Sequence, residues 1–284
     1  MQAFVSAIVP VFNNAAGIRN ALDALVAQSY PRRLYEIVVA DNGSTDGTQK
    51  LVKQYCEVYP DLVRMVVEDN MQSSYAARNK GLRLARGEIL AFLDSDCIPE
   101  THWIEAGVRA LLETPASCGG GALVFFFRSQ QPNIYESFDS IRKLNQKVYI
   151  EKAGFAATAN FFIRRELFEK YGLFRSDLTS GGDYEFGRRL TKADEKMIFI
   201  PKAVVRHPAR ATFGAILKKS RRIALGQKQL HEMGLLEHGK LSRKSLNPER
   251  RWPESDGVAL TTRQKVGLII LMNVFKYYNL VKRL

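Results

Sequence analysis

The chain has 284 residues, of which 46% are hydrophobic, 10% aromatic and 25% charged. This balance is typical of a folded globular protein and excludes disordered and fibrous classes. The three cysteines, Cys56, Cys97 and Cys118, lack the spacing of a disulfide framework or a thiolate zinc site, which favours a reducing, cytoplasmic location. We expect no export signal, and the longest apolar stretch, Val266 to Phe275, is far short of the ~20 residues that a membrane span needs.

The net charge of +13 is concentrated in the last third of the chain. Residues 1–200 carry 24 basic and 24 acidic side chains, whereas residues 201–284 carry 18 basic and 5 acidic. This segregation predicts an anionic partner for the last third, such as lipid head groups, nucleic acid or a phosphorylated substrate. Nucleic acid is disfavoured because the chain has no RNP-like aromatic run and no zinc-finger spacing.

Strands and helices are expected to alternate through the first hundred residues. Short apolar runs predict strands at 4–11, 36–40, 63–67 and 89–93. Good N-cap residues stand before the helices between them, namely Asn13 or Asn14, Thr45 or Asp46, and Ser73 or Ser74. Strict alternation predicts a parallel sheet with helices on both faces and ligand sites at the carboxyl ends of its strands. The first strand–helix junction has no GxGxxG turn, so NAD and FAD are disfavoured.

The pattern is less regular after Pro99, and residues 130–155 predict no clear element. The expected elements are a helix at 101–112, a strand at 122–127, helices at 166–171 and 183–191, and a strand at 198–205. Gly119 to Gly121 predict a close backbone approach, Gly181-Gly182 a hinge, and Pro201 an edge position for the last strand. From Thr212 onward the chain is expected to be helical and basic.

Two carboxylates, Asp94 and Asp96, follow the apolar run Ile89 to Leu93. At a strand end both could face one hard cation, and Mg²⁺ or Mn²⁺ is usually held by one or two carboxylates together with substrate phosphates. The alternative is a solvated turn with capping aspartates.

Other candidate residues stand at similar positions, and each has a plain structural alternative. Asp41 follows a strand and could accept hydrogen bonds from a base or a ribose, or could simply form the turn before Asn-Gly. Arg78 could face the same cleft or lie on the surface. Asp183 could be a general base at a helix start or a cap, with Glu185 as its rival. His207 could be a third metal ligand or a structural histidine.

The order of these motifs resembles the family 2 glycosyltransferases of GT-A fold, over about residues 5 to 210. The matching runs are Val9 to Asn13, Val38 to Asp46, Ala77 to Gly81, Phe92 to Asp96, Ala159 to Arg165, Gly181 to Phe186, and Val204 to His207. The resemblance implies an α/β, Rossmann-like GT-A domain at 1–210, with a mostly parallel central sheet flanked by helices. Residues 1–97 would form its nucleotide-binding half and 98–210 its acceptor-binding half. Residues 211–284 would be a basic, amphipathic helical extension.

The resemblance also implies an enzyme, an inverting transferase that uses a nucleotide-diphosphate sugar, most often a UDP-sugar, and Mg²⁺ or Mn²⁺. Pro10, Val11 and Phe12 would line the base pocket and Asp41 would hold the base. Asp94 would contact the ribose, with Ser95 and Arg78 in the same donor site.

Asp96 would bind the metal that bridges the diphosphate, and His207 would supply a further metal ligand or a diphosphate contact. Asp183 would take the proton from the acceptor hydroxyl. The expected pathway is cell-surface polysaccharide or glycolipid biosynthesis, with a glycan or lipid-linked acceptor.

Two departures from the family pattern matter. Gly182 stands where the family often has Glu, and the QxxRW signature of processive synthases is missing, since Arg251-Trp252 lacks the Gln. The second departure favours transfer of a single sugar over polymerisation.

The basic extension, residues 211–284, is expected either to lie on an anionic membrane surface, peripheral to the inner face, or to pack on the catalytic domain. Two other functions compete with a transferase. One is a degenerate, non-catalytic transferase that binds glycans or membranes. The other is a Mg²⁺-dependent phosphohydrolase of haloacid-dehalogenase type, whose nucleophile motif is also DxD.

Overall fold

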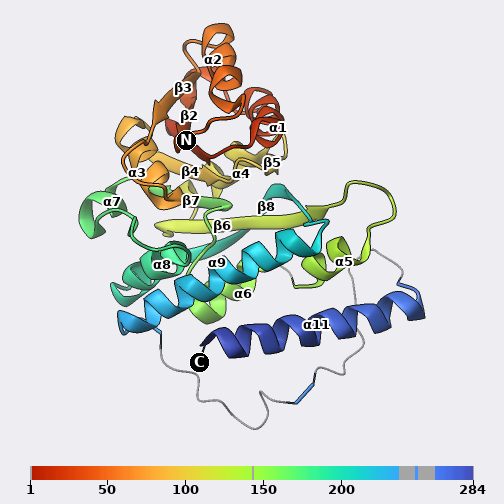
Figure 1. The fold of residues 1–284 in the computed structure, drawn as a ribbon. Helices are drawn as coiled ribbons and strands as arrows, with labels where there is room; N and C mark the ends of the chain where they lie inside the picture. Colours follow the sequence, from red (N-terminus) through yellow and green to blue (C-terminus); the bar gives the residue numbers. More distant parts are fainter. Residues whose placement is uncertain (1, 143, 237–246, 249–259, 284) are drawn as a thin grey trace. The chain divides into compact units, whose positions relative to one another are not determined.

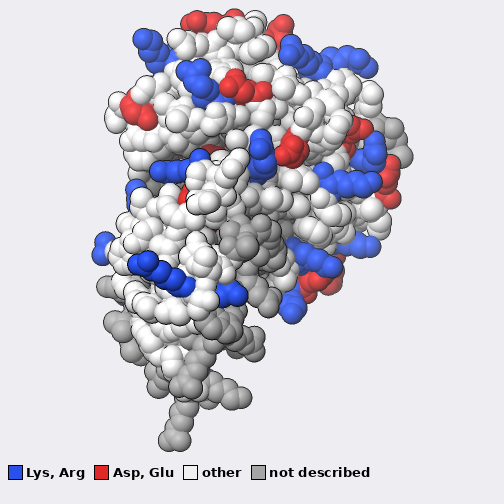
Figure 2. All heavy atoms as spheres, turned by 90° about the vertical axis from the view of Figure 1, so that its right-hand side faces the viewer, with Lys and Arg blue, Asp and Glu red and all other residues white. Residues whose placement is uncertain are grey.

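The computed structural model describes residues 2–142, 144–236, 247–248 and 260–283 (Figure 1). The chain forms two compact units. The first contains residues 1–124, 145–178 and 182–207, and the second contains residues 125–144, 179–181 and 208–284. In the upper part of Figure 2, where β1 to β3 and their helices lie, basic and acidic side chains are interspersed. The second unit, by contrast, carries 19 basic and 7 acidic residues in its sequence.

An eight-stranded sheet organises the first unit, in the order β3-β2-β1-β4-β7-β6-β8-β5. The strands are β1 (Val5–Val11), β2 (Tyr35–Asp41), β3 (Val63–Val67), β4 (Ile89–Leu93), β5 (Ile98–Pro99), β6 (Cys118–Phe126), β7 (Asn160–Arg164) and β8 (Met197–Pro208). Strand β1 pairs in parallel with β2 and β4, and β2 with β3, which confirms the expected parallel arrangement of the first four strands.

Beyond β4 the sheet is mixed. Strand β7 runs antiparallel to both β4 and β6, and β5 runs antiparallel to β8. The parallel interpretation therefore does not extend past β4, because the strict strand–helix alternation that produces parallel crossovers stops there.

The first unit contains every helix predicted there and three short helical segments that were not predicted. They are α1 (Ala15–Val26), η1 (Arg32–Leu34), α2 (Thr48–Val58), α3 (Ser74–Leu84), α4 (Trp103–Leu112), α6 (Gln146–Val148), η2 (Tyr149–Ala153), α7 (Glu166–Tyr171) and α8 (Gly182–Lys192). Asn14 and Ser73 cap α1 and α3, as expected. The N-cap of α2 is Gly47, not Thr45 or Asp46, and the Asp46 carboxylate accepts from the Thr48 N–H one position outside the cap.

The glycines of β6 bring two strands together, as expected. A Cβ on Gly121 would lie 2.2 Å from the Ala203 carbonyl oxygen, and one on Gly119 would lie 2.8 Å from that of Ile198, both on β8. Strand β6 begins at Cys118, four residues before the predicted start. Strand β8 was predicted at an edge, which is wrong for the sheet order because β5 lies outside it. However, β5 pairs only with Val205 and Arg206, and Pro201 lies away from this pairing.

The second unit contains α5 (Ile134–Ile141), α9 (Phe213–Glu232) and α11 (Thr262–Arg283). A small apolar core of Phe138, Ile216, Leu268 and Phe275 holds these helices together. The expectation of helices after Thr212 is confirmed by α9 and α11. Residues 237–246 and 249–259, including Arg251-Trp252, lie outside the described residues. Within the described part of the chain, none of the helices is long and apolar enough to span a membrane.

Buried charges also connect α5 and α9 in the second unit. The Asp139 carboxylate, with only 3% of its side chain exposed, accepts from Lys219 Nζ at 2.8 Å and from Arg210 Nη1 at 3.0 Å. These cations hold the pKa of Asp139 below its usual value, against the opposing effect of burial.

Candidate active site

The carboxyl end of β2 presents a buried carboxylate with one free oxygen. Asp41 is fully buried and pairs with Val11 across β1 and β2. Its Oδ1 accepts from the N–H groups of Gly43 and Ser44, at 3.0 and 2.9 Å, and from Gln49 Nε2 at 2.7 Å. Its Oδ2 is buried and has no hydrogen-bond partner among the described residues. Because an unsatisfied buried acceptor costs free energy, Oδ2 fits a ligand that donates an N–H or O–H.

The loop after β1 is joined to the loop after β2. Asn13 adopts a left-handed conformation, with φ of 47°, and its Oδ1 accepts from the Thr45 N–H at 2.8 Å. Its own N–H donates to Ser44 Oγ at 2.9 Å. Of the three residues expected to line a base pocket, Pro10 and Val11 are buried and Phe12 is 47% exposed.

A third loop, after β4, joins the same edge. Asn14 Nδ2 donates to Ser95 Oγ at 3.2 Å. The loops after β1, β2 and β4 are therefore tied together at the carboxyl ends of parallel strands, the location where α/β sheets bind ligands. Asp94 and Asp96 flank Ser95 at this edge.

Arg78 connects this edge to Asp183. The Arg78 side chain, from α3, is only 6% exposed, and its Nη2 lies 2.5 Å from Asp94 Oδ1. Burial raises the pKa of the Asp183 carboxyl, Arg78 opposes the rise and Asp94 adds to it. Arg78 is thus not a surface residue, and Asp183 lies within electrostatic range of both members of the pair.

Asp183 and Glu185, the two candidate bases, both lie near the N-terminus of α8 but have different partners. The Asp183 carboxylate accepts from the Tyr184 N–H at 2.9 Å, whereas Glu185 forms an ion pair with Arg189 at 2.8 Å. Glu185 is therefore neutralised within α8, and Asp183 is the carboxylate of this helix whose pKa responds to the charges of Arg78 and Asp94.

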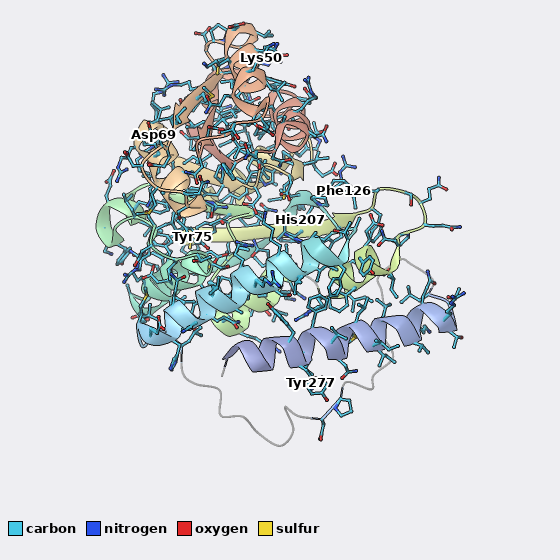
Figure 3. The ribbon with its side chains drawn as sticks, viewed as in Figure 1. Lys50, Asp69, Tyr75, Phe126, His207 and Tyr277 are labelled. Carbon is cyan, nitrogen blue, oxygen red and sulfur yellow. The ribbon has the colours of Figure 1, made fainter. Side chains whose placement is uncertain are left out.

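A side chain at position 182, where the family often has Glu, would clash with a neighbouring ring. Gly182 is the first residue of α8, and a Cβ there would lie 2.8 Å from the ring of Tyr75, which is buried and labelled in Figure 3. Gly182 is thus part of a packed helix start, and the Gly181-Gly182 hinge stays a prediction at the boundary between the two units. Gly181, with φ of 84°, makes the turn before it.

Asp96, Cys97 and His207 form a second group, whose ligand atoms all lie within 4.8 Å of one another. The antiparallel pairing of Ile98 with Arg206 brings His207, near the end of β8, beside Asp96 (His207 is labelled in Figure 3). Carboxylate oxygen suits Mg²⁺ or Mn²⁺, whereas imidazole nitrogen and the Cys97 thiol are softer atoms that transition metals accept more readily than Mg²⁺ does. Sequence reasoning missed Cys97, although its position directly after Asp96 was a usable signal. Asp94 is not in this group, and its carboxylate pairs with Arg78 instead.

The comparisons with known proteins identify the family. Residues 6–172 match the family model described as "Glycosyl transferase family 2". The chain belongs to glycosyltransferase family 2. It is 40% identical over 230 residues to "Glycosyltransferase AglE" of Haloferax volcanii, a match that covers 80% of this chain and 74% of that protein.

Two solved glycosyltransferases share the fold. One is the mannosyltransferase PcManGT from Pyrobaculum calidifontis in complex with GDP-Man and Mn²⁺, with a TM-score of 0.65, 20% identity, and coverage of 100% of this chain and 73% of that chain. The other is S. aureus TarS 1–349 in complex with UDP-GlcNAc, with a TM-score of 0.59, 19% identity, and coverage of 99% and 88%. The GT-A fold and the glycosyltransferase class expected from the motifs are confirmed, and the phosphohydrolase alternative is excluded.

Proposed function

We propose that this family 2 glycosyltransferase transfers a single sugar from a nucleotide-diphosphate sugar to a hydroxyl acceptor, with inversion at the anomeric carbon. One observation carries the proposal: the acidic side chains of the site form two separate groups. Asp96 and His207 form one group, and Asp183 stands outside it, beside Arg78 and Asp94. A transferase of this kind needs one group of side chains to bind the diphosphate of the donor and another to activate the acceptor hydroxyl.

The buried Asp41 carboxylate supports a uracil or guanine base. Its unpartnered Oδ2 is a hydrogen-bond acceptor and therefore needs a donor on the ligand. Uracil N3 and guanine N1 carry such an N–H, whereas cytosine N3 and adenine N1 are acceptors. Two solved relatives in fold are complexes of GDP-Man and UDP-GlcNAc, whose bases both carry that N–H. We favour uridine. Pro10, Val11 and Phe12 would line the base pocket.

The rest of the donor would lie across the loop after β4. Asp94 would contact the ribose, with Ser95 and Arg78 beside it. Asp96 and His207 would hold Mg²⁺ or Mn²⁺, which when bound neutralises the charge that develops on the departing diphosphate. The carboxylate oxygen fits either ion, the imidazole nitrogen fits Mn²⁺ better than Mg²⁺, and Mn²⁺ is present in the PcManGT complex.

Asp183 would act as the general base. Burial raises the pKa of its carboxyl, which makes the carboxylate a stronger base for the acceptor hydroxyl. A hydroxyl deprotonated by one carboxylate attacks from the face opposite the leaving diphosphate, so the product is inverted. General-base assistance of this kind contributes roughly 10²- to 10⁴-fold to the rate.

We also propose a peripheral, cytoplasmic position on an anionic membrane face, through residues 211–284, and a role in cell-surface polysaccharide or glycolipid synthesis. Helix α11 supports this, because Val266, Ile270, Val274 and Tyr277 are exposed at helical spacing (Tyr277 is labelled in Figure 3). Basic residues such as Arg263 lie on the same helix, and each contributes about 1 kcal/mol near an anionic surface. A glycan carried on a lipid would be the acceptor.

The proposal is tested by donor binding and transfer. Thermal unfolding with Mn²⁺ and UDP-, GDP-, CDP- and ADP-sugars should show stabilisation by UDP- or GDP-sugars, and NMR of the product should show an inverted anomeric centre. Asp183→Asn should keep donor binding and lose transfer by roughly 10²- to 10⁴-fold. Asp177→Asn is the matched control, because Asp177 is half exposed and forms a surface ion pair with Arg175. Full transfer by Asp183→Asn, or a retained anomeric configuration, contradicts the proposal.

A further inference from the structure

Three partly exposed aromatic rings gather beside Asp183. Tyr149 and Phe155 stack with their ring centroids 4.9 Å apart and their planes 15° apart. Phe155 contacts Tyr184 edge-on at 5.4 Å. None of the three belongs to the buried core, whereas the nearby rings of Phe168 and Phe186 are 4% and 1% exposed. Tyr149, Phe155 and Tyr184 are therefore an aromatic group at the surface of the first unit, which we call the aromatic platform.

The backbone is shaped to hold the aromatic platform. Tyr149 begins the π-helical turn η2, a rare geometry that occurs frequently at functional sites. Gly154 ends this turn in the left-handed conformation, with φ of 67°. Phe155 then lies against α8 at Gly187, where a Cβ would come within 2.4 Å of the Phe155 Cβ. Two glycines and an irregular turn thus position rings that the hydrophobic core does not use.

The aromatic platform lies next to the base. Tyr184 follows Asp183 directly, and its N–H donates to the Asp183 carboxylate. Tyr149 is close enough that the Asp183 charge, after burial, raises the pKa of its phenol. A molecule that covers the platform would have its edge groups near the Asp183 carboxylate.

The aromatic platform and the Asp183 carboxylate together favour one class of ligand. A pyranose ring presents a face of C–H groups and an edge of hydroxyls. The C–H face matches the negative face of an aromatic ring, and an edge hydroxyl can reach a carboxylate. A simple alcohol or a serine hydroxyl has no such face. The platform and Asp183 together therefore fit a sugar ring better than a non-sugar hydroxyl.

We propose that the aromatic platform is the acceptor subsite and that the acceptor group is a pyranose, stacked on Tyr149 with one hydroxyl at Asp183. This inference rests on the proposed function and deepens it, because it assigns the sugar ring of the acceptor to named residues beside the proposed base.

The first test measures binding and requires no turnover. Saturation-transfer NMR is recorded with a panel of methyl hexopyranosides, methyl N-acetylhexosaminides and methyl hexuronides, in the presence of UDP or GDP and Mn²⁺. Wild type should bind at least one glycoside, with the strongest signals from the C–H protons of one ring face. Tyr149→Ala should abolish the signal and Tyr149→Phe, which keeps the ring, should preserve it. Absence of binding by wild type, or equal binding by Tyr149→Ala, overturns the inference.

The second test separates acceptor binding from donor chemistry. Tyr149→Ala should raise KM for the glycoside by about 10-fold or more and leave hydrolysis of the nucleotide sugar unchanged. Tyr184→Ala provides an independent variant if Tyr149→Ala lowers the melting temperature. Tyr59→Ala is the matched control, because Tyr59 also belongs to a partly exposed stacked pair, with Tyr55, at the end of α2. Parallel loss of hydrolysis and transfer in the platform variants contradicts the assignment.

The two tests distinguish the two proposals. If wild type binds glycosides through Tyr149 but neither binds nor hydrolyses any nucleotide sugar, the proposed function fails and the sugar subsite stands. If donor hydrolysis occurs and no glycoside binds, the subsite fails and the donor half of the proposed function stands.

Discussion

The free oxygen of Asp41 leads to a prediction about base recognition. In Asp41→Asn the amide has one oxygen and one NH₂ group in place of two oxygens. Three donors, the N–H groups of Gly43 and Ser44 and the amide of Gln49, already converge on Oδ1. The Asn oxygen will therefore occupy the Oδ1 position, and the NH₂ group will occupy the position of the unpartnered Oδ2.

The magnitude follows from this replacement. A hydrogen bond from uracil N3–H or guanine N1–H to a carboxylate contributes about 1.5 to 3 kcal/mol, and in the variant two donors face each other instead. Because about 1.4 kcal/mol corresponds to a factor of ten, UDP and GDP should bind about 10- to 150-fold more weakly. Cytosine presents an acceptor nitrogen at the same place, so CDP should bind equally well or better.

Calorimetry with UDP, GDP and CDP in the presence of Mn²⁺ measures this change in preference. Asp46→Asn is the control, because Asp46 is exposed, lies on the same loop and accepts from Thr48 without a free buried oxygen. Unchanged UDP and GDP affinities in Asp41→Asn would refute the assignment of Oδ2 to the base. A uniform loss for all three nucleotides would show that the substitution acts through loop structure.

Three further predictions concern the metal, the base and the second unit. Asp96→Ala should weaken Mn²⁺ binding by more than about 100-fold in calorimetry, and an unchanged affinity would remove Asp96 from the metal site. Burial raises the pKa of Asp183, so ionisation costs stability as the pH rises above the usual value of 3.8. Asp183→Asn should melt higher than wild type at pH 8, by about 2 to 4 °C for each kcal/mol that ionisation of this partly buried carboxyl costs. The difference should shrink as the pH falls. A melting temperature of the variant below that of wild type at pH 8, measured by calorimetry, would refute this prediction. Asp139→Ala leaves Lys219 and Arg210 without their carboxylate and should cost about 3 kcal/mol in urea unfolding, whereas a loss below about 1 kcal/mol would contradict their pairing.

The elements that the sequence predicted best are those with local causes. Strands β1, β2 and β4 are mostly apolar because both faces of the parallel sheet are buried there, whereas β3, at the end of the sheet, is only partly buried. The caps Asn14 and Ser73 act on N–H groups two or three residues away. The position of Asp94 and Asp96 after a strand is equally local. These features require only neighbouring residues, so composition and spacing were sufficient to locate them.

The aromatic platform was not predicted, for the opposite reason. No clear element was predicted for residues 130–155, where the structure has α5, α6 and η2. The η2 segment, which carries Tyr149, is a π-helical turn that follows neither a strand nor an α-helical pattern. The closeness of Tyr149 to Asp183 depends on Gly187 allowing Phe155 to lie against α8, which a sequence pattern does not report.

By itself, the amino-acid order determined the family, the parallel half of the sheet and the identity of the polar residues at its edge. Only the tertiary structure decided that β7 runs antiparallel, that His207 meets Asp96 and Cys97, that Arg78 binds Asp94 and that residues 125–144 join the basic second unit. These outcomes depend on which buried surfaces meet across long stretches of chain. That choice is made by the free energy of packing the whole molecule and not by local periodicity.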